Sequence, residues 1–116
     1  MRYVSTRGDA PILDFEDVLL SGLARDGGLY VPESWPTFSA ADFADMAGRP
    51  YTDVATRIVT PFAPSIAQDD IASMVDAAYS TFSHPAVAPL AQLDANEFLL
   101  ELFHGPTLAF KDLAMQ

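Results

Sequence analysis

The sequence predicts an α/β protein, with a mostly helical unit containing a few short strands followed by a buried strand and the start of another helix. Three observations favour this class. Apolar residues over 65–82 recur at spacings of three and four, as on one helix face. Short β-like runs alternate with turns rich in glycine and proline. The composition also changes near residue 95, which predicts a division into units 1–95 and 96–116.

The first third of the chain is expected to hold two short strands and one helix. The strands are predicted at Tyr3–Ser5 and Leu29–Val31, with a glycine turn before the second. The helix is predicted over 14–24, because Asp14 is a suitable N-cap and acidic residues follow it in the first turn. Its apolar face comprises Phe15, Val18, Leu19 and Leu23.

Three helices are expected in the middle of the chain. The first lies within 39–48 and the second within 51–60, where Pro61 stops it. The third, over 65–82, has the clearest apolar periodicity, and its apolar face is expected to form the core. That face comprises Ile71, Met74, Val75, Ala78, Tyr79 and Phe82.

The last third begins with a proline-rich connector that contains one short extended piece, followed by a turn at 94–96. The apolar density of 97–103 predicts a strand buried on both faces. A helix is expected to follow, with Thr107 as its N-cap.

Composition narrows the functional classes. The chain has 116 residues, half of them hydrophobic, and a net charge of −10, which disfavours nucleic acid and anionic membranes as partners. With no cysteine and two isolated histidines, neither a thiolate site nor a metal site is expected. No segment is apolar enough to span a bilayer and no apolar signal core is present, so a cytoplasmic location is expected.

Lys111 is the strongest candidate for chemistry. It is the only lysine in the chain and falls one turn after the predicted N-cap, near the positive end of the helix dipole. That position, together with desolvation behind a buried strand, would favour a neutral, nucleophilic amine suited to Schiff-base formation with a carbonyl cofactor. The alternative is a surface lysine paired with Asp112 or another carboxylate.

Other candidates have structural alternatives. Asp112 could orient the lysine or a cofactor, or could simply suit the start of a helix. Thr107 could contact an anion or act only as a cap, and His104 could face a cleft or form a structural hydrogen bond. The segment Ser5–Arg7 could reach a substrate phosphate, although stabilisation of a turn is the simpler role.

Three blocks resemble the threonine synthase family, in that family's order and approximate spacing. They are YVSTRG at the N-terminus, LLSGLARDGGLYVPESWP after it, and LFHGPTLAFKDLAMQ around Lys111. Arg25 departs from the family pattern, which often has proline there. The resemblance implies a pyridoxal-phosphate enzyme of fold type II, the tryptophan synthase β-like group, with 96–116 as the beginning of the cofactor-binding domain.

The resemblance further implies that Lys111 forms the Schiff base with pyridoxal phosphate. The family converts O-phospho-L-homoserine and water to L-threonine and phosphate through this aldimine, and the freed lysine amine moves protons. Asp112 would be a secondary cofactor contact, and Thr107 and His104 secondary substrate contacts.

Two alternatives stay open at this stage. One is a related pyridoxal-phosphate-dependent phospholyase acting on another phosphorylated amino compound, and the other is a non-catalytic interaction module. The chain contains no glycine-rich loop at a helix start to hold a cofactor phosphate. We therefore expect an N-terminal part of a longer enzyme that is inactive alone, with self-association or a disordered tail where 98–116 lack partners.

Overall fold

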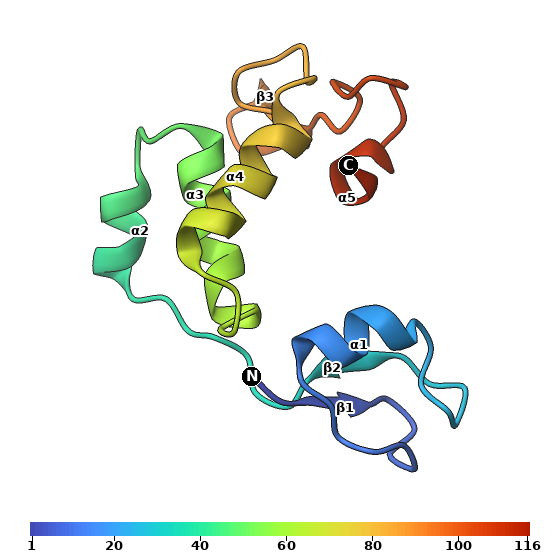
Figure 1. The fold of residues 1–116 in the computed structure, drawn as a ribbon. Coiled ribbons are helices and arrows are strands. Elements are labelled where there is room, and N and C mark those ends of the chain that lie inside the picture. Colours follow the sequence, from blue (N-terminus) through green and yellow to red (C-terminus); the bar gives the residue numbers. More distant parts are fainter.

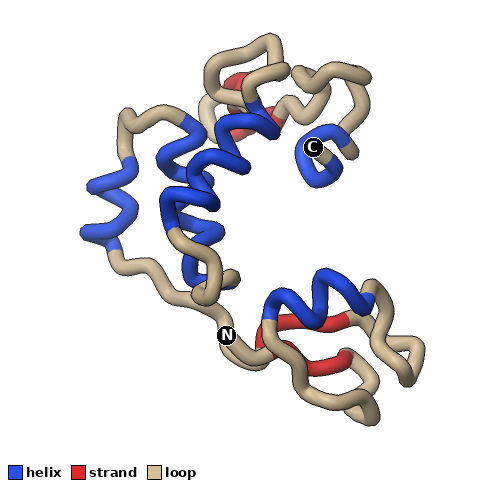
Figure 2. Tube along the Cα trace, viewed as in Figure 1, coloured by secondary structure: helices blue, strands red, loops and turns tan.

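The computed structural model describes residues 1–116, which form an open arch with two arms (Figure 1). One arm contains β1, α1 and β2. The other contains the helices α2 to α4, followed by a small hairpin and the short helix α5. The strands form two separate two-stranded sheets and no larger sheet, as Figure 2 shows. The predicted mixture of helices and short strands is confirmed at this level.

The first arm is built on a short antiparallel pair. β1 (Tyr3–Ser5) pairs with β2 (Tyr30–Pro32), so that Tyr3 lies opposite Pro32. α1 (Phe15–Ser21) begins after Asp14, whose carboxylate accepts a hydrogen bond from the Asp17 N–H at 3.0 Å. The predicted N-cap is therefore confirmed.

The far end of α1 differs from the prediction. The helix ends at Ser21, because Gly22 adopts a positive φ of 67° that stops the helical turn. Leu19 and Leu23, predicted to share one apolar face with Phe15 and Val18, are 69 % and 65 % exposed. Leu23 lies beyond the last helical residue, so the predicted face is shorter than the sequence indicated.

The second arm contains α2 (Ala40–Met46), α3 (Tyr51–Val59) and α4 (Gln68–Tyr79). α2 starts with a capping box between Ser39 and Asp42. A 3₁₀ turn, η1 (Thr60–Phe62), continues the chain through Pro61 after α3 ends. The three predicted helices are thus confirmed.

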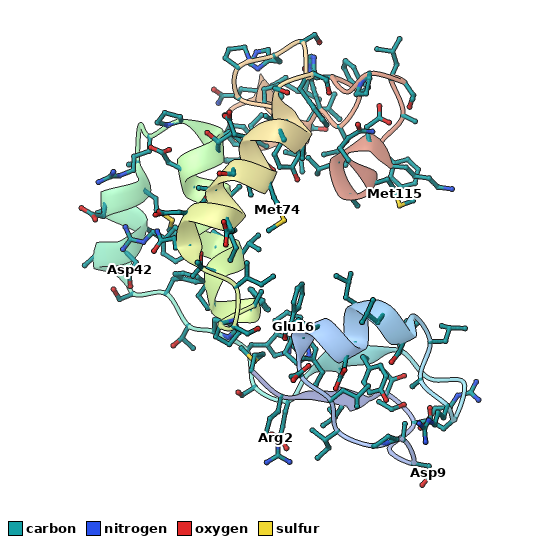
Figure 3. The ribbon with its side chains drawn as sticks, viewed as in Figure 1. Arg2, Asp9, Glu16, Asp42, Met74 and Met115 are labelled. Atoms are coloured by element: carbon teal, nitrogen blue, oxygen red, sulfur yellow. The ribbon has the colours of Figure 1, made fainter.

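The core lies where α3, η1 and α4 meet. Ala63, Ile71 and Val75 are buried together, with Phe15 and Tyr79 packed against them. Met74, expected in this core, is 53 % exposed and projects into the open side of the arch, as Figure 3 shows. That prediction was wrong, because only the Ile71–Val75 side of α4 faces α3.

Two contacts join the arms. The Tyr3 hydroxyl donates to the Phe62 carbonyl at 2.7 Å, and Phe15 of α1 packs against the buried cluster of Ala63, Ile71 and Val75. Burial raises the pKa of Tyr3, which keeps this hydroxyl protonated. The β1 strand is therefore anchored directly to the helical arm.

The predicted buried strand is instead half of an exposed hairpin. β4 (Glu97–Leu100) pairs antiparallel with β3 (Leu90–Asp94), and all four β4 residues are exposed. A two-stranded ribbon has no second layer to cover either face, so its apolar side chains remain in solvent. The expected turn at 94–96 is confirmed, and the predicted boundary between 95 and 96 falls within it.

The C-terminal segment turns twice before its helix. α5 (Asp112–Met115) begins with Lys111 as N-cap, so Thr107 is not the cap that the sequence predicted. Leu108 has a positive φ of 61°, which is incompatible with a helix starting at 107. No helix in the chain is long and apolar enough to cross a membrane.

Candidate functional site

Lys111 is the residue immediately before α5, and its side chain is exposed. It takes part in none of the ion pairs or side-chain hydrogen bonds of the structure. The alternative prediction, an ion pair with Asp112, does not hold, because that carboxylate is buried and hydrogen-bonded to Thr107. The desolvation expected at this junction is also absent. What remains is a free primary amine on an ordered turn.

Asp112 organises that turn. Its carboxylate accepts hydrogen bonds from the Thr107 hydroxyl at 2.6 Å and from the Thr107 backbone N–H at 2.8 Å. Only 4 % of Asp112 is exposed. The Thr107 hydroxyl, assisted by backbone groups of 107–109, lowers the pKa of Asp112 against the opposing effect of burial. An ionised carboxylate therefore closes the loop that precedes Lys111.

Gly105 makes this closure possible. A Cβ added at Gly105 would lie 2.5 Å from Asp112 Oδ2 and 2.8 Å from its Cγ, and still closer to its Cβ. These distances are far below ordinary van der Waals contact, so only glycine fits at 105. The His-Gly-Pro-Thr sequence therefore has a steric requirement that comes from the buried aspartate next to the lysine.

His104 is held at the other end of the loop. Its Nε2 lies 2.7 Å from Glu101 Oε2, and its ring lies 5.1 Å from that of His84. The side chain is mostly covered, with 17 % exposed. The structure thus favours the structural hydrogen bond that was the alternative to a cleft-facing role.

The segment 104–115 is attached near both of its ends to the last residue of α4 and to the turn that follows that helix. Ser83 donates its backbone N–H to the His104 carbonyl at 2.9 Å, and its hydroxyl donates to the same carbonyl at 3.2 Å. A second attachment lies nine residues after His104, where the Tyr79 hydroxyl donates to the Leu113 carbonyl at 2.9 Å. Local sequence patterns do not predict this second attachment, because they place Tyr79 only on the apolar face of its helix.

Ser5–Arg7 form a second polar unit, in the other arm. The Ser5 hydroxyl donates to Asp26 Oδ1 at 2.8 Å, the Arg7 guanidinium donates to the Asp26 carbonyl at 3.0 Å, and Thr6 Oγ1 accepts the Leu29 N–H at 3.0 Å. Burial alone would raise the pKa of Asp26, but hydrogen bonds from Gly28, Ser5 and Asp9 outweigh it and lower the pKa. This unit therefore stabilises a turn.

Asp26 was missed as an organising residue. Its signal was the Asp-Gly-Gly sequence, since an aspartate before two glycines commonly accepts backbone N–H groups in a turn. Gly28 lies so close to Ser5 and Asp26 that a Cβ there would be 3.0 Å from Asp26 Oδ1. The STRG and DGGLY sequence blocks are therefore two halves of one structural unit.

The structure thus brings together four of the predicted residues and separates them from the rest. His104, Thr107, Lys111 and Asp112 share one looped segment, while Ser5–Arg7 lie in the opposite arm (Figure 1). A surface hollow of about 520 Å³ lies between α3 and α4 and is not lined by Lys111. No cluster of three or more metal-ligating side chains is present. The candidate site consequently centres on the Lys111 amine.

Comparisons with known proteins identify relatives over the whole chain. A family model described as "Threonine synthase N terminus" matches residues 2–79. Threonine synthase from Pseudomonas aeruginosa is 59 % identical over 117 residues, covering 100 % of this chain and 25 % of that protein. Threonine synthase from Methylobacillus glycogenes is 43 % identical, covering 100 % of this chain and 26 % of that protein.

A solved structure agrees with these relatives. The crystal structure of PLP-bound threonine synthase from Brucella melitensis superposes with a TM-score of 0.94 at 59 % identity, covering 99 % of this chain and 25 % of that one. The chain thus spans about a quarter of the length of the proteins it matches.

Proposed function

The chain belongs to the threonine synthase family, and we propose that it serves as the N-terminal part of an enzyme that converts O-phospho-L-homoserine and water to L-threonine and phosphate. Pyridoxal phosphate is the proposed cofactor, and Lys111 the residue that holds it covalently. The single observation that carries this assignment is the free Lys111 amine on an ordered turn. The PLP-bound relative supports the choice of cofactor.

Lys111 and the turn that holds it are suited to covalent attachment of an aldehyde cofactor. A lysine engaged in an ion pair would have to break it before its amine could react, and Lys111 has none to break. The turn is fixed by Asp112 and Thr107 rather than by the lysine itself. A reactive amine on a backbone held by other residues is the arrangement that site preorganisation requires.

Pyridoxal phosphate, when bound, supplies an electron sink for charge that develops at the substrate Cα. The Lys111 amine is the proposed general base and acid. It would remove one proton from Cα and one from Cβ, which allows phosphate to leave from Cγ, and would return one proton to Cγ. After water adds its hydroxyl at Cβ, a proton returns to Cα and the remaining proton leaves with phosphate. The substrate is thus a phosphorylated amino acid.

The neighbouring candidates take supporting roles in this proposal. The Asp112 carboxylate and the Thr107 hydroxyl bind each other, and His104 is engaged by Glu101. These hydrogen bonds engage both Asp112 oxygens, the Thr107 hydroxyl and His104 Nε2, which favours positioning of the lysine over direct contact with cofactor or substrate.

We expect the 116-residue chain alone to have no synthase activity. None of its helix starts carries a glycine-rich loop that could hold a cofactor phosphate, so the group would be bound through Lys111 only. The exposed β4 and α5 side chains also favour self-association of the isolated chain.

The test is phosphate release by a full-length threonine synthase that begins with this chain. We expect release from O-phosphohomoserine and much less from O-phosphothreonine. Lys111→Arg, which keeps the positive charge but not the nucleophilic amine, is expected to abolish turnover. Preference for O-phosphothreonine would favour the related phospholyase, and turnover by the isolated chain would contradict the expected inactivity.

A further inference from the structure

We propose that Tyr79 is a positioning residue for Lys111, acting through the hydrogen bond from its hydroxyl to the Leu113 carbonyl. The proposal rests on the proposed function of Lys111. Tyr79 is the last residue of α4, whereas Leu113 belongs to α5, 34 residues later in the sequence. The helical unit would then contribute directly to the geometry of the reactive amine.

The residue that Tyr79 contacts is close to Lys111 in the sequence. Leu113 is two residues beyond Lys111 and inside α5, the helix that Lys111 caps. The Lys111 carbonyl accepts the Ala114 N–H at 3.0 Å, so a shift of α5 moves the Lys111 backbone with it. A hydrogen bond of 2.9 Å to Leu113 therefore restricts where the lysine stem begins.

The Tyr79 hydroxyl is aimed by its own neighbours. Its ring packs edge-to-face against Tyr51 with centroids 5.1 Å apart, and against Phe82 at 5.2 Å. Burial raises the pKa of Tyr51 to about 12, and the proximity of Tyr79 adds to that rise, which indicates a tightly packed pair. Two aromatic contacts thus leave the Tyr79 ring little freedom to turn away from Leu113.

Within these 116 residues, apolar packing adds little to this hydrogen bond. Leu108, Phe110 and Met115 are 72 %, 67 % and 76 % exposed, so the lysine-bearing segment buries few of its large apolar side chains. The segment is held mainly by polar contacts, from Ser83 at its start and from Tyr79 near its end. Where few apolar contacts exist, local opening depends on such hydrogen bonds.

The experiment compares Tyr79→Phe with Tyr30→Phe in a full-length threonine synthase that begins with this chain. Both variants remove one hydroxyl that donates to a backbone carbonyl, and the Tyr30 partner is Pro11 at 3.0 Å in the other arm. The phenylalanine ring preserves the aromatic packing in each case, so both variants should fold. Circular dichroism and thermal unfolding check this before the other measurements.

We expect Tyr79→Phe to speed amide hydrogen exchange across 112–115 by about 2- to 12-fold, the effect of losing one ordinary hydrogen bond. The dissociation constant for pyridoxal phosphate, measured by absorbance titration, should rise by a similar factor. Tyr30→Phe should change neither quantity. If both tyrosine variants alter exchange and cofactor binding equally, or if Tyr79→Phe alters neither, the positioning role is overturned.

The two proposals fail in different ways. If reductive labelling of the unmodified enzyme places the cofactor on a residue other than Lys111, the proposed function fails. If the label is on Lys111 and Tyr79→Phe accelerates exchange without weakening cofactor binding, the positioning role alone is overturned.

Discussion

Gly105→Ala should loosen the lysine-bearing segment specifically. The new methyl group would lie 2.5 Å from Asp112 Oδ2 and 2.8 Å from Asp112 Cγ. Asp112 cannot swing aside without breaking its hydrogen bonds to Thr107, because both carboxylate oxygens are engaged. The backbone of the loop must therefore move, and overpacking of this kind costs about 1–3 kcal/mol.

This cost should destabilise the segment 107–115 locally, without lowering the stability of the whole fold. A cost of about 1–3 kcal/mol raises the open population of 107–115 by about 5- to 150-fold. Amide exchange followed by NMR should show this as faster exchange at Thr107, Asp112 and Ala114, whose N–H groups are hydrogen-bonded within the segment. Amides of α4 should be unaffected.

Gly22→Ala is the matched control. Nothing lies within 4 Å of a Cβ at Gly22, so its cost comes only from the positive φ of 67° and falls in the other arm. The reasoning is refuted if Gly105→Ala leaves exchange across 107–115 unchanged, or if Gly22→Ala accelerates it to the same extent.

Three further outcomes follow from burial and charge. Ile71→Ala removes a side chain that is only 2 % exposed and should cost about 2–4 kcal/mol, seen as a lower thermal midpoint, whereas Ile12→Ala at a 45 % exposed position should cost far less. The pKa of Tyr51 rises from 10.0 to about 12 on folding, so its contribution to the free energy of unfolding should be fully present below pH 10 and should be lost between pH 10 and 12. Denaturant unfolding at a series of pH values should show a smaller loss in Tyr51→Phe. For this half-buried group, solvent screening limits the effect to about 1 kcal/mol. Because the folded-state pKa of Asp26 lies below 3.8, its contribution to the free energy of unfolding should be present above pH 3.8 and lost as the pH falls further. Asp26→Asn should remove this part of the acid unfolding transition. An acid transition unchanged by the substitution would contradict the prediction.

Local signals in the sequence predicted local structure well. Asp14 was identifiable as an N-cap because aspartate before an apolar-periodic run satisfies free N–H groups, and its carboxylate does so. The helix at 51–59 was predictable from the stop at Pro61, and the helix at 68–79 from its apolar periodicity. These features depend on neighbours within one or two turns, which is the range over which a single sequence carries information.

Features that depend on distant parts of the chain were not predictable. Periodicity marked Leu19 and Met74 as apolar face residues but could not show whether an element would cover them, and both are exposed. The run at 97–103 was read as a buried strand, since its composition does not distinguish a covered strand from an open hairpin.

The candidate site likewise combines local features that the sequence predicts with distant contacts that it does not. Lys111 was identified from its position and from family resemblance, whereas its supports required the structure. Thr107 was read as a helix cap, and instead it closes a loop onto Asp112 because Leu108 takes a left-handed conformation. The Tyr79 contact with Leu113 spans 34 residues, and no local pattern announces it.

The identity of the residue that carries the cofactor is the central claim. A full-length threonine synthase that begins with this chain would be loaded with pyridoxal phosphate, reduced with borohydride, digested, and mapped by mass spectrometry. We expect the reduced pyridoxyl group on the peptide containing Lys111, the only lysine among these 116 residues, and no such label in Lys111→Arg. A pyridoxyl label on any other peptide of the enzyme would contradict the assignment.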